Sequence, residues 1–285
     1  MPSYLALHTA LLIWAATALF AKLIPLPAAE IIQLRSAPAL VALCITMIFF
    51  RQGFGLSGRN LWIAPLLGLL MAGHWVCFYL SVQTATVAVG LITLYSYPAL
   101  TVLLEPLIHR HWPSWKLVVL ALLGLGGISL IALVDQPVED LPLAIGYGLF
   151  SSVCFTCRNL VSKYLASELS SIQQMWWQVL ITLLLLSLWL GAPDTQSLNQ
   201  EILFLLCLLG VVFVALPHTL FLFSLKQIPA ARASLISMIQ PVYGVLFAWF
   251  ILAEQPHWVQ IFGGIIVLTS AWLATREGLV HETNR

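Results

Sequence analysis

Two stretches of this chain, LITLYSYPAL at residues 91–100 and SLISMIQPVY at residues 234–243, decide how its fold is interpreted. A shift of 143 residues superimposes them and puts Pro98 on Pro241. Further matches lie on both sides: the same shift pairs Pro113 with Pro256 and Trp115 with Trp258, and a shift of 141 residues pairs Lys22 with Lys163, Ile31 with Ile172 and Gln33 with Gln174. One loop insertion explains the difference between the shifts, so the chain is predicted to consist of two related halves.

The composition restricts where such a chain can fold. Of its 285 residues, 61% are hydrophobic and only 8% are charged. A soluble domain has about 45–50% apolar and about 25% charged residues. The net charge of +1 also provides no basic field for nucleic acid. We therefore expect an integral membrane protein made of helices, and we exclude a water-soluble enzyme, a nucleic-acid binder and a disordered chain.

Apolar windows of about 20 residues, the length that crosses the hydrocarbon core, predict ten membrane spans. Their ranges are 3–23, 29–50, 61–81, 86–108, 115–134, 141–162, 172–190, 201–225, 231–253 and 256–275. The first window lacks a basic start and a small-residue cleavage site. It is therefore interpreted as a retained membrane helix and not as a removed signal peptide.

Basic residues predict the orientation of these spans, because cytoplasmic loops carry an excess of Lys and Arg. If the N-terminus is cytoplasmic, the inside loops hold Arg51, Arg59, Arg110, Lys116, Lys163, Lys226, Arg232, Arg276 and Arg285. The outside loops then hold only Lys22. This asymmetry predicts a multi-pass protein with both termini in the cytoplasm.

The repeat and the ten spans together predict the domain organisation. Residues 3–134 and 141–275 would each form a five-helix repeat, and residues 276–285 a cytoplasmic tail. Because five is odd, the second repeat must enter the membrane from the opposite side. Inverted repeats of this kind are typical of alternating-access transporters, which bind substrate near the membrane midplane between the repeats.

Helix-end residues of both halves carry a family resemblance. They are Pro241, Ala253-Glu254-Gln255-Pro256, Trp258 and Gly263-Gly264 in the second half, Pro98, His111-Trp112-Pro113 and Trp115 in the first, and Arg35 in the second span. Over residues 3–275 the chain resembles the drug/metabolite transporter superfamily in its ten-helix, EamA-type form. It departs from that family at His111, where Glu is common. The resemblance implies secondary transport, most often export of amino acids or small metabolites, across a bacterial inner membrane. It also implies a monomer or weak dimer, because one chain holds both repeats.

Two arginines within the spans are candidates for substrate binding. A charged side chain at the centre of a membrane helix costs at least about 2.5–3.5 kcal/mol, so it should face a partner or a cavity. Arg35 and Arg158 could each receive a substrate carboxylate through a bidentate hydrogen bond. The alternatives are a structural pairing, with Glu30 in the case of Arg35, or an extended side chain that reaches the membrane interface.

Three further residues are candidates for coupling or gating. Glu105 in the fourth span could carry a proton, or it could be an ordinary carboxylate near the cytoplasmic end. Pro98 and Pro241 each remove a helix hydrogen bond and could form hinges.

Histidines and aromatic residues complete the candidate set. His74 and His218 lie in near-equivalent positions of the two halves, and histidine is the usual proton carrier near neutral pH. Aromatic side chains can form the walls of a binding site for flat or cationic groups. The candidates for substrate contact are Tyr79, Tyr97, Trp176 and Tyr243, although packing or contact with lipid would also account for them.

The sequence predicts no cofactor and no metal, because it has no catalytic triad, zinc-ligand spacing or nucleotide-binding loop. We therefore expect a transporter and not an enzyme, with a small molecule and the lipid bilayer as its partners and no nucleic acid. The leading hypothesis is export of amphipathic metabolites such as amino acids. The alternative is export of cationic drugs or quaternary amines; proton coupling and import stay open.

Overall fold

The computed structural model describes residues 2–132, 140–191, 198–243, 246 and 257–282, and regular structure in these residues is entirely helical. The helices are α1 (Ser3–Trp14), η1 (Thr17–Leu19), α2 (Phe20–Leu23), α3 (Ala28–Phe49), α4 (Asn60–Thr84), α5 (Val87–Leu94), α6 (Tyr97–Ile108), α7 (Trp115–Ala132), α8 (Leu141–Tyr164), α9 (Ser171–Leu190), α10 (Gln200–Leu208), η2 (Leu209–Ala215), α11 (Leu216–Leu225), α12 (Ala230–Ser237) and α14 (Trp258–Glu282). Several predicted features lie partly or wholly outside the described residues: the end of the fifth span and the connection up to residue 139, parts of the ninth span, the motif at residues 253–256, and the last three residues of the tail.

Helix lengths within the described residues agree with a membrane protein. Seven helical stretches are long and apolar enough to cross a membrane. They are Ser3–Leu23, Ala28–Phe49, Asn60–Thr84, Val89–Ile108, Leu141–Tyr164, Ser171–Leu190 and Gln200–Leu225. Each coincides with a predicted span, although the third continues three residues beyond its predicted end, to Thr84. Shorter apolar helices, Trp115–Leu130 and Ile261–Ala274, lie at the fifth and tenth predicted spans.

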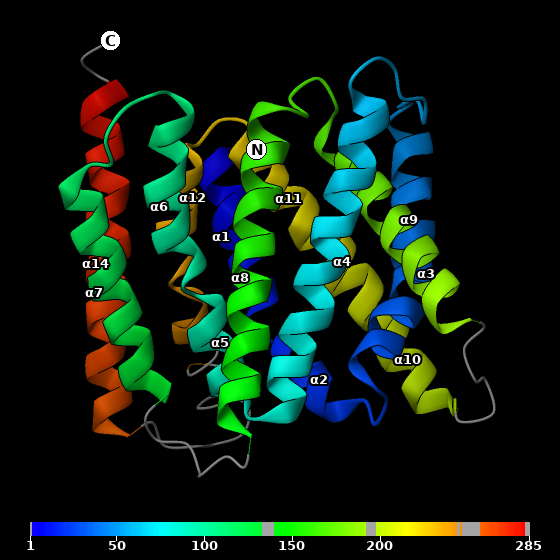
Figure 1. Cartoon of the computed structure of the whole chain (residues 1–285), viewed down its shortest axis with the longest axis horizontal. Coiled ribbons are helices and arrows are strands. Elements are labelled where there is room, and N and C mark those ends of the chain that lie inside the picture. The colour runs from blue at the N-terminus through cyan, green and yellow to red at the C-terminus, as the bar shows by residue number, and fades with distance from the viewer. Residues whose placement is uncertain (1, 133–139, 192–197, 244–245, 247–256, 283–285) are drawn as a thin grey trace.

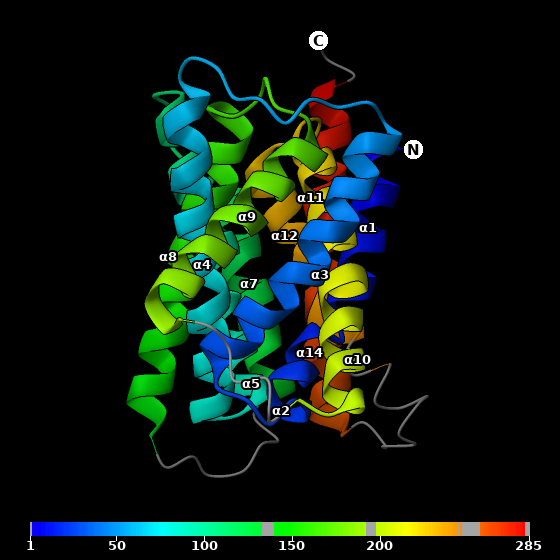
Figure 2. The same cartoon turned by 90° about the vertical axis from the view of Figure 1, so that its right-hand side faces the viewer.

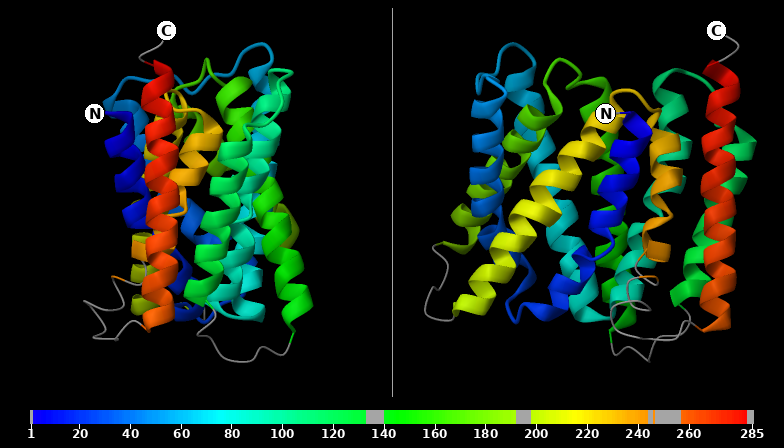
Figure 3. Two further views of the ribbon diagram at one scale, coloured as in Figure 1. Left: turned by 90° about the vertical axis from the view of Figure 1, so that its left-hand side faces the viewer. Right: turned by 180° about the vertical axis from the view of Figure 1, so that it is seen from behind.

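The helices form one bundle, and most of them run from one end of the bundle to the other (Figure 1). The start of α1 and the end of α14 lie at the same end, which we call the terminal end (Figure 3). The connections 50–59, 109–114, 165–170 and 226–229 also lie there, and these are loops that the sequence analysis assigned to one side. The connections 24–27 and 85–86 lie at the opposite end.

Packing brings distant parts of the chain together. Helices α7 and α14 pair along one edge of the bundle, whereas α3, α9 and α10 form the other edge (Figure 1). Between them α4 packs on α8, α1 on α11 and α6 on α12. Helices α3 and α9 cross obliquely over α4 when the bundle is seen from its side (Figure 2). Large apolar side chains cover the outside, including Trp62, Trp112 and Trp258 near helix ends, as expected for a surface that meets lipid and its interfaces.

Two of the predicted spans are interrupted in the middle. Helix α5 ends at Leu94, and α6 begins at Tyr97 with Pro98 in its first turn, where the missing N–H costs no helix hydrogen bond. Helix α12 ends at Ser237, and a turn at residues 238–239 precedes a further helical turn at 240–243 that contains Pro241. The predicted hinge prolines therefore follow real breaks in the helices.

The eighth predicted span contains a wider turn. Between α10 and α11, the π-helical segment η2 packs directly on α3. A Cβ atom on Gly210 would lie 2.3 Å from the backbone oxygen of Arg35, so only glycine permits this approach. The contact fixes the backbone of α3 at Arg35.

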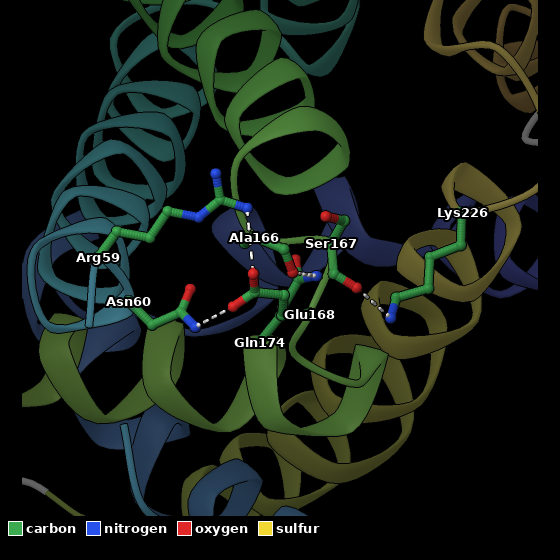
Figure 4. A network of polar contacts seen from close by, with 7 residues as sticks. All are labelled: Arg59, Asn60, Ala166, Ser167, Glu168, Gln174 and Lys226. Carbon is green, nitrogen blue, oxygen red and sulfur yellow. Dashed lines mark hydrogen bonds and ion pairs between the residues drawn. The ribbon is translucent and has the colours of Figure 1, made fainter. Parts of the chain in front are cut away.

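At the terminal end, polar contacts hold the α8–α9 connection (Figure 4). Arg59 and Asn60, at the start of α4, reach the Glu168 carboxylate at 3.5 and 3.2 Å. Lys226, after α11, donates to the carbonyl oxygen of Ser167 at 3.2 Å. Burial lowers the pKa of the Lys226 ammonium. These contacts join loops of both halves at one end of the bundle.

Candidate functional site: a buried cluster of arginines and aromatic rings

Arg35 lies in the interior of the bundle, with 1% of its surface exposed. Its Nη1 donates to the Tyr79 hydroxyl at 3.3 Å, and that hydroxyl donates onward to the backbone oxygen of Thr17 at 3.2 Å. The guanidinium carbon lies 4.8 Å from the Trp75 ring centroid and 5.0 Å from that of Tyr79. Two electron-rich rings thus stabilise the cation, each by about 0.5–2 kcal/mol. The predicted alternative, a pair with Glu30, does not occur among the described contacts.

Arg158 is fully buried, with 0% exposure, and its surroundings are amides. Its Nε donates to Gln178 Oε1 at 2.7 Å, and its Nη1 donates to Asn159 Oδ1 at 2.9 Å. The guanidinium carbon lies 5.8 Å from the centroid of the Phe155 ring. Since both amides use their oxygens on Arg158, their NH₂ groups are left as donors, and neither finds an acceptor among the described residues.

Aromatic and imidazole rings connect the two arginines. Trp75 donates its indole N–H to His218 Nε2 at 3.2 Å, and Trp14 packs edge-on against His218 with ring centroids 4.5 Å apart. Phe155 lies 6.3 Å from Trp14 and stacks on His74 at 4.4 Å. Five of the predicted substrate residues therefore share one cluster: Arg35, His74, Tyr79, Arg158 and His218.

Protonation of the two histidines follows from their partners. An indole N–H can only donate, so His218 Nε2 must accept, and the proton of the neutral ring resides on Nδ1. The Ser151 hydroxyl donates to the backbone oxygen of His74 at 2.9 Å, so its oxygen accepts a hydrogen bond from the N–H at His74 Nδ1, at 2.8 Å. Neither ring supplies negative charge to the arginines.

The cluster has more donors than acceptors. Within the described part of the chain, seven buried N–H bearing atoms find no hydrogen-bond partner: Arg35 Nε and Nη2, Arg158 Nη2, Asn159 Nδ2, Gln178 Nε2, His218 Nδ1 and Trp14 Nε1. No described carboxylate lies within ion-pair distance of either guanidinium. An unpaired buried polar group costs about 1–3 kcal/mol, and a charged one costs more. Such a concentration of free donors is chemically suited to an anion.

Glu105 lies outside this cluster, near the terminal end. Its carboxylate accepts the backbone N–H of Ala230 at 2.7 Å and that of Ala231 at 2.6 Å, the first residues of α12. The Tyr164 hydroxyl donates to the same carboxylate at 2.6 Å. The sequence analysis did not identify the partners of Glu105, because its contact with Ala230 joins parts of the chain 125 residues apart.

The remaining predicted residues have separate environments. Tyr97 is buried, and its ring meets Phe155 at 4.9 Å, so it borders the cluster. Trp176 donates to Cys44 Sγ at 3.1 Å and packs on the rings of Phe54 and Trp177; among the described contacts none joins it to either arginine. Tyr243 lies 3.4 Å from His8 Nδ1 on α1. The structure therefore brings Arg35, His74, Tyr79, Tyr97, Arg158 and His218 together, and Trp176 and Tyr243 stand apart from them.

Sequence analysis overlooked Asn159 and Gln178. Both are fully buried amides within predicted spans, and polarity inside a membrane segment was the available signal. Trp14 and Phe155 carried no comparable signal, because aromatic side chains in membrane helices usually pack or face lipid. Their role depends on contacts between α1, α8 and α11 that one sequence does not reveal.

Comparisons with known proteins agree on the class of molecule. The model of the EamA-like transporter family matches residues 1–133 and, a second time, residues 142–276. The chain is 24% identical over 230 residues to an uncharacterized transporter of Synechocystis sp., covering 79% of this chain and 70% of that protein. It is 26% identical over 198 residues to an uncharacterized transporter of Archaeoglobus fulgidus, covering 69% and 70% of the two chains.

A solved crystal structure has the same fold. It superimposes with a TM-score of 0.80 at 17% sequence identity and covers 96% of this chain and 97% of the other. At this identity the likeness concerns the fold alone.

Proposed function

We propose that this chain, which belongs to the EamA-like transporter family, is a secondary transporter that exports small carboxylate-bearing metabolites, such as amino acids, across a bacterial inner membrane by alternating access. Membership of the family makes it a multi-pass membrane transporter and not an enzyme. The substrate class, the direction and the mechanism are the proposal.

One observation carries the substrate class: Arg35 and Arg158 are buried without a carboxylate partner among the described residues, and both retain free N–H groups. A guanidinium matches the two oxygens of a carboxylate with two parallel hydrogen bonds. A bound carboxylate would therefore remove the cost of the unpaired charge. The alternative substrate, a cation, would meet two positive charges and no described negative one in the same cluster, so we do not favour it.

Equivalent contacts in the two halves support an inverted repeat. The Ser81 hydroxyl donates to the backbone oxygen of Ala144 at 2.7 Å, and the Ser224 hydroxyl donates to that of Ser3 at 2.8 Å. Ser224 follows Ser81 by 143 residues, and Ala144 follows Ser3 by 141, the same two shifts that superimpose the halves. Trp75 and His218, which contact each other directly, are also 143 residues apart.

The broken helices support the same arrangement. The break at 95–96 and the turn at 238–239 are again separated by 143 residues. Interrupted helices at corresponding positions of two repeats commonly border the substrate site of a transporter. This supports ten spans in two five-helix repeats, with Pro98 and Pro241 beside the hinges. The predicted cytoplasmic side is the terminal end, which carries most of the basic loops.

Glu105 is the proposed gate. Its bonds to Ala230 and Ala231 fasten α6 to the N-terminus of α12, and the helix dipole favours a negative charge there. A transporter that opens towards the terminal end has to separate such contacts. Protonation of the carboxylate would weaken them and could couple opening to protons.

Transport in proteoliposomes tests the proposal. Purified protein is first screened by thermal shift against amino acids, organic acids and quaternary amines, because a ligand of the native state raises its apparent stability. Each stabilising carboxylate is then tested in counterflow with its labelled form. We expect exchange by the wild type, loss of exchange in Arg35→Gln, and normal exchange in the control Arg59→Gln, whose side chain is exposed. Stabilisation and exchange by amines alone would contradict the proposed substrate class.

A further inference from the structure

Arg35 and Arg158 offer two separate anion positions. Among the described residues the two guanidiniums share no hydrogen-bond partner and no ring partner. The surroundings of Arg35 come from α4, whereas those of Arg158 come from α8 and α9. The Trp14 and Phe155 rings lie within the chain of contacts that joins them.

Each position has its own free donors. Arg35 retains Nε and Nη2, two adjacent N–H groups of the guanidinium fork. Arg158 retains Nη2, and the NH₂ groups of Asn159 and Gln178 are free beside it. Each set is sufficient for both oxygens of one carboxylate.

The two positive charges of Arg35 and Arg158 determine how many carboxylates a substrate needs to neutralise the cluster. The described contacts of the arginines are with the Tyr79 phenol, with aromatic rings and with amides, so none of these neighbours is negative. A substrate with one carboxylate would neutralise one guanidinium and leave the other uncompensated in the interior, where an unpaired ion costs several kcal/mol. A substrate with two carboxylates neutralises both.

We propose that the site selects small dicarboxylates, including acidic amino acids, with one carboxylate on Arg35, the other on Arg158 and the intervening carbon chain against the Trp14 and Phe155 rings. This inference rests on the proposed carboxylate transport and narrows it to substrates with two acidic groups. The two amides beside Arg158 make that position the richer in neutral donors.

The preference for dicarboxylates is tested by measuring the binding of pairs of ligands that differ only in one acidic group. The purified wild type in nanodiscs is titrated calorimetrically with succinate, glutarate and L-glutamate, and with their monoamides succinamate, glutaramate and L-glutamine. Each pair differs by one charge at nearly constant size. We expect each diacid to bind at least about tenfold more tightly than its monoamide. In Arg35→Gln and in Arg158→Gln that ratio should fall to about one, while it persists in the control Arg59→Gln.

Lysine variants distinguish loss of a specific contact from loss of folding. Arg35→Lys and Arg158→Lys keep the charge, so each should retain a preference for the diacid, and helix content by circular dichroism identifies any variant that unfolds. Equal binding of diacid and monoamide by the wild type would overturn the inference while leaving carboxylate transport in place. A preference that survives both glutamine variants, or tighter binding of glycerol 3-phosphate than of every dicarboxylate, would overturn it too. Binding of tetramethylammonium with no binding of any acid would refute the proposed function itself.

Discussion

The strongest test of the proposed gate at the terminal end is the substitution Glu105→Gln. Helix α12 starts at Ala230, and the first four N–H groups of a helix have no partner within the helix. The two amides of Ala230 and Ala231 are therefore protected by the Glu105 carboxylate, which accepts them through different oxygens. Glutamine has nearly the same shape but only one oxygen, so one backbone N–H would face an NH₂ group instead of an acceptor.

The expected change in hydrogen exchange follows from the loss of one hydrogen bond to Glu105. A hydrogen bond to a charged group contributes about 1.5–3 kcal/mol, so loss of one such bond shifts the local opening equilibrium by about tenfold to 150-fold. Hydrogen exchange in nanodiscs, followed by mass spectrometry of peptides that contain Ala230 and Ala231, measures this ratio directly. Glu168→Gln is the matched control, because Glu168 is exposed at the same end; among the described residues its carboxylate contacts Arg59, at 3.5 Å, and Asn60.

The outcome is specific to α12. In Glu105→Gln, exchange should accelerate at the start of α12 and remain unchanged in α9, whereas Glu168→Gln should leave α12 as it is. Unchanged exchange at Ala230 and Ala231 in a folded Glu105→Gln protein would refute the claim that this carboxylate holds the gate. An equal acceleration in every helix would also refute it, since that pattern indicates global destabilisation.

Two other predictions concern the site and the topology. Gly210→Ala should displace α3 and reduce substrate binding through Arg35, because the new Cβ meets a backbone oxygen 2.3 Å away; overpacking of this kind costs about 1–3 kcal/mol. Gly126→Ala, where a Cβ meets nothing within 4 Å, is the control, and equal binding by both variants would show that the close approach is unimportant. In a protein without its native cysteines, Arg110→Cys should react with an impermeant maleimide from the cytoplasmic side and Asp140→Cys from the opposite side; labelling of both from one side would contradict the orientation.

Sequence predicted the scaffold better than the site. The hydropathy of each span depends on its own residues, so the helices that the structure describes begin and end close to their predicted positions. Arg35 and Arg158 were also recognisable, because a charge within an apolar run is rare and costly. Their partners were not, since Gln178 is 20 residues from Arg158 and Tyr79 is 44 from Arg35. Trp176 was proposed as a substrate residue by its type, but its contacts are with Cys44 and other rings.

The charges of the cluster depart from the proposed symmetry of the scaffold. Under the shift of 141 residues that relates Lys22 to Lys163, Arg35 corresponds to Trp176 and Arg158 corresponds to Thr17. Lys22 and Lys163 make equivalent contacts, each donating to backbone oxygens about 60 residues away, at 3.0 Å for Ala85 and 2.7 Å for Ile228. A contact needed to build each half therefore occurs twice, whereas each buried arginine occurs once. An unpaired buried cation destabilises the fold, so Arg35 and Arg158 are not accounted for by the stability of the repeats. Binding of an anionic ligand would account for both.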